Sequence, residues 1–214
     1  MSPVVLGIDT SALVCAGVAV DTAVVASGVV ADARAHAEQL LPLVSRVLDE
    51  AGLGGLAGVD AIAVGVGPGP FTGLRVGVAA AAVLAEALGV GVRGVCSLDV
   101  LASQAVAGGL VPAGEFVVAS DARRREWYWA RYGPDGRRLA GPFVTAPAEV
   151  PDLPAIGPVT GTPLALDAGH LAAVAARLPE AGLEPLYLRR PDAEVPTARK
   201  STLLPPRLAS GRIR

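Results

Sequence analysis

The stretch "GVGPGPFTGLRVGVAAAAVLAEALG", residues 65–89, restricts the folds open to this chain more than any other segment. It follows the apolar residues 59–64, and it holds six glycines and two prolines around an apolar run of helical length. A buried strand, a Gly/Pro loop and a helix in this order are typical of α/β proteins, many of which hold a phosphate at such a loop. The first question is whether this loop binds a nucleotide.

Neither of the common nucleotide-binding motifs fits the loop. The pattern G-x-G-x-x-G fails because Pro70 takes the third glycine position when counting begins at Gly65 and Gly67. The Walker pattern fails because no Lys-Ser or Lys-Thr follows the glycines, and Thr72 is followed by Gly73. We therefore predict that the loop turns the chain sharply and does not bind phosphate.

The helix after the loop has a ridge of small residues. Gly73, Gly77 and Ala81 are four residues apart, so they lie on one face and admit another backbone very close. Glycine inside a helix costs up to about 1 kcal/mol, which close packing offsets. We expect this helix and the one at 34–50 to pair with the same helices of a second copy or of a partner protein.

Hydrophobic periodicity predicts a mixed α/β chain. The first part reads as three antiparallel strands, then helix, strand, helix, strand and helix, at residues 4–8, 14–20, 24–31, 34–50, 59–66, 72–88, 90–95 and 97–106. Pro42 should kink the first helix or mark where its regular part begins. A joint at 107–114 separates a second set of strands at 115–120, 126–132 and 138–144, followed by a helix at 168–178. The restart of the strand pattern suggests a weak internal duplication.

Composition limits the size of the core and the cellular location that we expect. With 214 residues and 52% hydrophobic side chains, the chain can bury one sizeable core or two small ones. Its longest uncharged runs contain Gly and Pro and are shorter than the roughly 18–20 residues of a membrane span, and its first residues do not look like a signal peptide. We expect a cytoplasmic protein without a membrane span, in which Cys15 and Cys96 are buried thiols.

Charge is unevenly distributed. The net charge of −2 gives no overall attraction to nucleic acid. Residues 189–214, however, carry seven basic and two acidic side chains. Their aperiodic, Pro-bearing sequence predicts a largely disordered basic tail over 192–214, whose deletion should leave folding intact.

Five segments together resemble one protein family: "LGIDTSA" at 6–12, "HAEQLLP" at 36–42, "GPGPFTGLRVG" at 67–77, "DARRREWYWARY" at 121–132 and "PLYLRR" at 185–190. They are similar, in this order, to the TsaB (YeaZ) family. The resemblance implies a two-lobed, actin-like ATPase fold of the ASKHA type, with one lobe at 1–108 and a reduced second lobe at 109–191. It also implies a non-catalytic partner of TsaD in making threonylcarbamoyladenosine beside the anticodon of tRNAs that read ANN codons.

The resemblance also indicates the partners and their surface. TsaB pairs with TsaD through helices of the first lobe, the ATPase TsaE joins them, and a homodimer is expected when the chain is alone. Contact with tRNA would be indirect, through the complex. The interface residues that we expect are His36, Leu40, Leu41, Val44, Phe71, Thr72, Gly73, Arg75, Gly77 and Ala81.

Two turns correspond to the phosphate loops of the actin-like fold. Asp9, Thr10 and Ser11 follow the first strand, where the aspartate would position a metal-bound nucleotide; a simple turn capped by Asp and Ser is the alternative. The second turn begins at Asp121 but continues with the arginines at 123–125, where a phosphate would need small residues and free amides. We expect both turns to be vestigial and no cofactor to bind, except ATP or ADP at a shared surface with TsaD.

No metal site is predicted. The two histidines with which TsaD binds metal correspond here to Ser97 and Leu101, neither of which suits a metal. His36 and His170 are far apart in sequence and lack partners at ligand spacing, so a capping or interface role is expected for His36. We therefore find no support for a metallopeptidase and no catalytic residue.

The arginines at 123–125 and Arg131 flank four aromatic residues between 127 and 132. Such a pattern can bind single-stranded nucleic acid, although an aromatic strand packed on both faces would look the same. Our main prediction is a scaffold subunit. The rivals are a free-standing ATPase or kinase of the same fold and an autonomous RNA-binding protein.

Overall fold

The computed structural model describes residues 2–30 and 36–189, and the tail predicted at 192–214 lies outside them. The first lobe is built on a five-stranded sheet with the order β3-β2-β1-β4-β5. Its strands are β1 Val4–Asp9, β2 Val14–Val20, β3 Ala23–Val30, β4 Ala61–Gly65 and β5 Gly91–Val95. Strands β1 to β3 are antiparallel, and β4 and β5 run parallel to β1, as the sequence pattern predicted.

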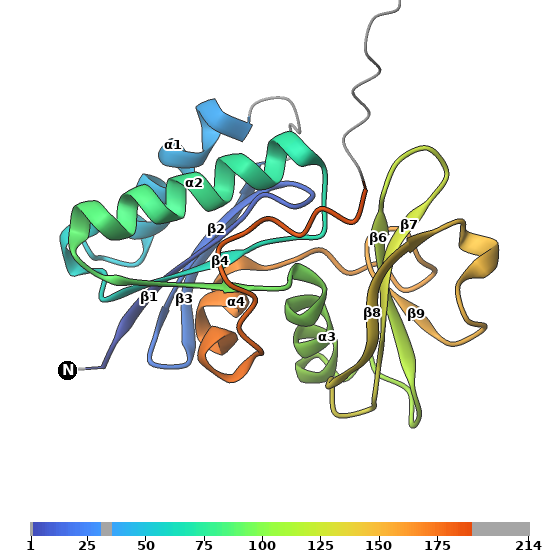
Figure 1. The fold of residues 1–214 in the computed structure, drawn as a ribbon. Helices are drawn as coiled ribbons and strands as arrows, with labels where there is room; N and C mark the ends of the chain where they lie inside the picture. The colour runs from blue at the N-terminus through green and yellow to red at the C-terminus, as the bar shows by residue number, and fades with distance from the viewer. Residues whose placement is uncertain (1, 31–35, 190–214) are drawn as a thin grey trace, which may run out of the picture.

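A second sheet repeats this topology. Its strands are β6 Phe116–Asp121, β7 Trp127–Tyr132, β8 Arg138–Thr145 and the two-residue β9 Ala155–Ile156, in the order β8-β7-β6-β9. Again the first three are antiparallel and the fourth is parallel to the first, so the suspected duplication exists in the topology. The two sheets lie in separate lobes (Figure 1). The protein has the two-lobed actin-like fold, with a second lobe that is smaller than the first.

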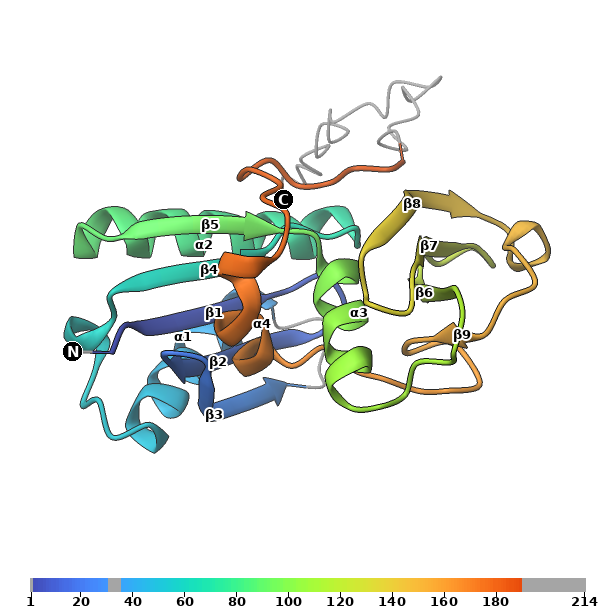
Figure 2. The same ribbon diagram turned by 90° about the horizontal axis from the view of Figure 1, so that it is seen from below.

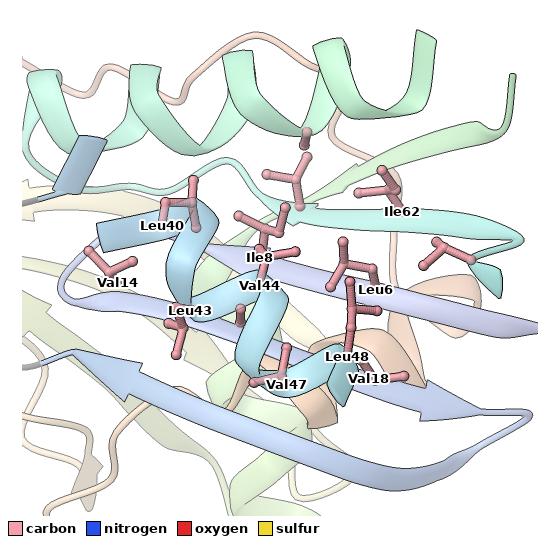
Figure 3. Close-up of a cluster of buried hydrophobic side chains, with 14 of the residues drawn as sticks. Leu6, Ile8, Val14, Val18, Leu40, Leu43, Val44, Val47, Leu48 and Ile62 are labelled. Carbon is pink, nitrogen blue, oxygen red and sulfur yellow. The ribbon is translucent and has the colours of Figure 1, made fainter. Parts of the chain in front are cut away.

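Two long helices cover one face of the first sheet. They are α1 His36–Glu50 and α2 Phe71–Leu88, which lie side by side (Figure 1). The core forms between α1 and the strands (Figure 3), from the buried side chains of Leu6, Ile8, Val14, Val18, Leu40, Leu43, Val44, Val47, Leu48 and Ile62. Pro42 lies on the exposed side of α1, and the helix continues through it.

The two remaining helices do not follow the lobe boundaries expected from the sequence. Helix α3, Ser97–Ala107, precedes the joint but packs on the second sheet, where Leu98 and Leu101 contact Phe116 and Tyr132. Helix α4, Ala168–Val174, follows the second sheet but returns to the first and covers the face opposite α1 and α2 (Figure 2). The expectation that the helix at 168–178 belongs to the second lobe is therefore wrong in packing terms. The helix is also shorter than expected, since it ends at Val174 and a 3-10 turn follows from Ala175 to Arg177.

Backbone contact between α4 and the first sheet explains this return. Gly7 and Gly17 are paired across β1 and β2. A Cβ at Gly7 would lie 2.0 Å from the carbonyl oxygen of Ala168, and one at Gly17 would lie 2.2 Å from the amide nitrogen of Gly169. Only glycine permits this approach, since any side chain would overlap helix backbone, which cannot rotate away. The glycine pair thus forms the seat of α4.

The small-residue ridge of α2 also packs inward. Gly73, Gly77 and Ala81 are buried, and a Cβ at Gly77 would meet Thr10 Oγ1 at 2.2 Å. The prediction that this ridge faces a partner protein is therefore wrong, because β1 and the turn after it already occupy that face. By length and composition alone α2 could also cross a membrane, but a helix packed in a protein core passes the same test.

We predict that Gly17→Val severely destabilises the chain. Valine has a higher strand propensity than glycine, so propensity alone would make the variant more stable. A loss of stability must therefore come from overlap of the valine side chain with α4. Overpacking costs about 1–3 kcal/mol or more, and each kcal/mol lowers the Tm of a chain of this size by about 2–4 °C. The matched control is Gly91→Val in β5, where an added Cβ meets nothing within 4 Å. Equal Tm values for the two variants in thermal unfolding would contradict the proposed seat.

Candidate functional site

The turn after β1 forms a closed hydrogen-bond network. Asp9 is 1% exposed, and its Oδ1 accepts hydrogen bonds from the amide of Ser11 (2.8 Å) and from Ser11 Oγ (2.7 Å). Its Oδ2 accepts one from Ser97 Oγ (2.6 Å), and this hydroxyl in turn accepts one from the amide of Gly67 (3.1 Å). The first turn, the start of α3 and the glycine loop therefore meet at one buried carboxylate.

The glycine loop packs directly on this turn. A Cβ at Gly69 would lie 2.3 Å from the carbonyl oxygen of Ser11, and one at Gly65 would overlap the carboxylate of Asp9. Thr10 Oγ1 donates a hydrogen bond of 2.7 Å to the carbonyl oxygen of Gly73 in the first turn of α2. The glycines of the loop are thus needed for close packing, as the sequence predicted. Both hydroxyls of the turn are donated to groups within the chain.

Burial sets the protonation behaviour of Asp9. Desolvation raises its pKa above the ordinary value, while the hydrogen bonds from Ser11 and Ser97 oppose this effect. A carboxylate that positions a metal-bound nucleotide needs the charged form, which this environment disfavours. The turn therefore has the sequence of a phosphate loop with its polar groups directed into the protein.

The second turn repeats the backbone geometry of the first at the surface. Asp121 Oδ1 accepts a hydrogen bond of 2.8 Å from the amide of Arg123, two residues on, as Asp9 Oδ1 does from Ser11. Asp121 is exposed, however, and residues 123–125 have φ angles of 59°, 54° and 63°. This left-handed conformation is unfavourable for arginine. Tyr128 Oη lies 3.4 Å from the carbonyl oxygen of Gly69 and links β7 to the glycine loop.

The aromatic residues of β7 are structural. Tyr128, Trp129 and Tyr132 are 6%, 8% and 0% exposed, so their rings are not available for stacking with bases. Of the motif at 121–132, only Asp121 and the arginines at 123–125 are exposed. The alternative that the strand is packed on both faces is thereby confirmed for these three aromatics, while Trp127 is half-buried.

The candidate metal positions hold no metal-ligating cluster. Ser97 donates to Asp9, and Leu101 is buried in the core under α3. His170 Nε2 lies 3.1 Å from Ser103 Oγ, and burial lowers the pKa of this histidine. Within residues 2–30 and 36–189, no three His, Cys, Asp or Glu side chains gather at metal-binding distance. Cys15 and Cys96 are buried free thiols whose pKa values are raised by desolvation.

The expected interface residues other than His36, whose side chain lies outside the described part of the structure, divide into two groups. Leu40, Val44, Gly73, Gly77 and Ala81 are buried within the first lobe and are not available to a partner. The exposed members are Leu41, Phe71, Thr72 and Arg75. In α2, helical periodicity could not separate the two groups, because a helix that is apolar on most of its surface gives no sign of which side faces its own sheet.

A contact that sequence reasoning missed fixes the start of α2. The ring of Tyr187, from the last described segment, lies 4.7 Å from that of Phe71, and Tyr187 Oη accepts a hydrogen bond of 2.9 Å from Arg75 Nε. The Arg75 guanidinium lies 4.0 Å from the centre of the Phe71 ring. Arg189 in the same segment pairs with Glu126 of the second lobe. The motif "PLYLRR" at 185–190 was the sequence signal for this segment, but it gave no indication of a contact with α2.

We predict that Asp9→Asn raises the Tm at pH 8. Because the folded pKa of Asp9 is raised, its ionised form destabilises the folded state above that pKa, and this cost disappears as the pH falls through it. Asparagine retains the acceptor for Ser11 without the charge. A gain of about 1 kcal/mol would raise the Tm by about 2–4 °C. The gain should shrink between pH 8 and pH 4 in thermal unfolding.

The matched variant Ser97→Ala removes a hydrogen bond that favours the charged form of Asp9, so it should lower the Tm at pH 8. A Tm for Asp9→Asn that lies below the wild-type value at every pH would contradict this account. It would mean that the carboxylate stabilises the turn as an ion.

Comparisons with known proteins agree on the family. The model of the family described as "TsaD: tRNA N6-adenosine threonylcarbamoyltransferase" matches residues 25–194. An uncharacterised protein of Mycobacterium tuberculosis is 47% identical over 207 residues, which cover 89% of this chain and 93% of that protein. The tRNA threonylcarbamoyladenosine biosynthesis protein TsaB of Escherichia coli is 34% identical over 131 residues, or 61% of this chain and 55% of its own.

A solved structure extends the match over the whole fold. YeaZ from Pseudomonas aeruginosa superposes with a TM-score of 0.70 at 31% identity, covering 87% of this chain and 100% of that one. The motifs, the duplicated topology, the buried Asp9 turn and these relatives lead to one conclusion: the chain belongs to the TsaB (YeaZ) family.

Proposed function

We propose that this protein is a non-catalytic subunit in the biosynthesis of threonylcarbamoyladenosine in tRNA, where it binds and holds a TsaD-type transferase. The relatives named TsaB carry that pathway in their names, and the matching family model is that of the transferase itself. A chain that shares the transferase's fold but not its metal residues fits the role of a partner. Ser97 and Leu101 stand where the resemblance places the two metal-binding histidines of TsaD.

The outer surface of α1 and α2 is the proposed binding surface. Its apolar side chains include Leu41 (53% exposed), Val83 (68%) and Phe71 (40%), on two adjacent helices above the first sheet (Figure 1). Apolar groups gathered on one side of a monomer are typical of protein interfaces. Pairing with the equivalent helices of TsaD would bury them in a helical bundle. Without TsaD, a second copy of the chain can cover them in the same way, which accounts for the expected homodimer.

The contacts of the Asp9 turn support a non-catalytic role. Its carboxylate, both hydroxyls and the glycine loop are engaged with one another. Every side-chain oxygen of Asp9, Thr10 and Ser11 has a partner within the chain, so none of them is directed at a reactant. At the phosphate-loop turns, ATP or ADP would then bind only where TsaD completes the site, and TsaE would join the assembled pair. Function would come from the partner's orientation and stability rather than from a reaction on this chain.

We predict that the double variant Leu41→Glu, Val83→Glu loses both TsaD binding and self-association, while its circular dichroism spectrum is unchanged. Two exposed apolar side chains cost nothing to replace in the monomer, but two buried charges cannot be accommodated in a helical bundle. Co-purification with TsaD and sedimentation equilibrium measure the two effects. Leu139→Glu in β8, also exposed (47%), is the control and should behave as wild type. Unchanged binding in the double variant would place the interface elsewhere.

We further predict that the purified chain neither binds ATP tightly nor transfers threonylcarbamoyl. Calorimetry with ATP and Mg²⁺ should give no isotherm in the low micromolar range. Transfer to tRNA should require TsaD and the other pathway proteins, and it should fall when the Leu41→Glu, Val83→Glu variant replaces wild type. ATP turnover by the chain alone that is lost in Asp9→Ala would overturn the scaffold role in favour of a free-standing ATPase.

A further inference from the structure

An open cavity of about 720 Å³ lies between the two lobes, on a part of the chain that the proposed function does not use. Three segments line it: helix α3, the turn between β7 and β8, and the end of α4 with its 3-10 turn. Figure 2 shows α3 between the two sheets with α4 beside it. The volume falls within the range of about 300–1,000 Å³ that is usual for small-molecule sites.

Charged side chains of both signs line this cavity, with an excess of one arginine over the aspartates. Arg137, Arg138 and Arg177 line it together with Asp99 and Asp135. Arg138 lies 3.4 Å from Asp99 and offsets its charge. Arg137 and Arg177 are exposed, and their guanidinium groups have no carboxylate partner among the described residues. Two arginines from different lobes are therefore available to an anion that enters the cavity.

A buried acceptor accompanies these cations. Asp99 is 3% exposed; its Oδ1 accepts a hydrogen bond of 2.8 Å from Tyr132 Oη, whereas its Oδ2 is buried and has no hydrogen-bond partner in the described chain. Buried polar atoms are rarely left unpaired, and each exception calls for an explanation such as a missing ligand or water. One turn further along α3, Ser103 pairs with His170. The cavity thus offers a hydroxyl, an imidazole and an unpaired acceptor beside its arginines.

The rest of the lining is apolar. Val106, Val174, Leu178 and Pro179 form this part of the wall, and Val106 is 37% exposed. Inorganic phosphate alone would leave the apolar surface and Asp99 Oδ2 without a partner. A molecule with an anionic group, a hydroxyl or amine donor and an apolar part could engage all three features.

We propose that this cavity binds a small organic phosphate that also carries hydroxyl groups and an apolar ring, with Arg137 and Arg177 holding the phosphate. The site is separate from the Asp9 turn and from the outer surface of α1 and α2. Because its residues come from both lobes, a bound ligand would connect the β7–β8 turn to α3 and α4. The proposal does not depend on the transferase partnership.

Titration of the full chain with AMP, followed by NMR or calorimetry, tests the site. AMP combines a phosphate, ribose hydroxyls and an apolar ring, so we expect saturable binding with a Kd below about 1 mM. Adenosine, which lacks the phosphate, and inorganic phosphate, which lacks the rest, should each bind at least tenfold more weakly. The double variant Arg137→Ala, Arg177→Ala should weaken AMP binding at least tenfold, because charge-assisted contacts to phosphate are among the strongest that the site can offer.

Two control variants locate the binding. Arg46→Ala removes an exposed arginine of α1, far from the cavity in sequence and on another face, and should leave AMP binding unchanged. Asp121→Ala alters the second phosphate-loop turn and should also leave it unchanged. The proposal is overturned if AMP shows no saturable binding, if the double arginine variant binds as wild type does, or if Asp121→Ala abolishes binding, which would place the nucleotide at the phosphate-loop turns instead.

Discussion

The fold depends on the contact between α4 and the paired glycines of β1 and β2. Helix α4 has only seven residues, too few for a stable helix in isolation, so packing must supply its stability. Gly7 and Gly17 let its backbone touch the sheet, and Asp167 anchors its start. The Asp167 Oδ1 atom accepts hydrogen bonds from the amide of Gly169 (2.7 Å) and from Ser27 Oγ in β3 (2.5 Å). This seat returns the chain from the second sheet to the first and ties the lobes together.

That return also explains why the second lobe is small. With α4 removed to the other sheet, the only long helix on the second sheet is α3, at least within residues 36–189. The other face of the second sheet is covered by Val150, Leu153 and Val159 in short or irregular segments. Both lobes therefore have the same strand order, but more of the helices pack on the first sheet than on the second. As a result, α3 and α4 meet between the lobes, where the cavity forms.

The Asp9 and Asp121 turns share a local hydrogen-bond geometry but have different surroundings. Asp9 and Asp121 make equivalent hydrogen bonds to the amide two residues on, yet one side chain is buried and the other exposed. The difference arises because the glycine loop and Ser97 close over the first turn, whereas Asp121 stays exposed among the described residues. A phosphate-loop sequence thus becomes a packing joint. Binding on the outer helices is the role that remains best supported.

Apart from the two-residue β9, the order of strands and helices followed from the sequence alone, because hydrophobic periodicity and the glycine and proline breaks are local properties of the chain. The motifs around Asp9, Gly67 and Asp121 likewise indicated the family. Tertiary structure alone decided which face of each element is buried: it turned Gly77 inward against Thr10, left Leu41 outside and placed α4 on the first sheet. It also brought Asp99, Arg138 and His170 to one cavity. Residues 71 positions apart meet there because two helices cross between the lobes, a relation that no local pattern in the sequence records.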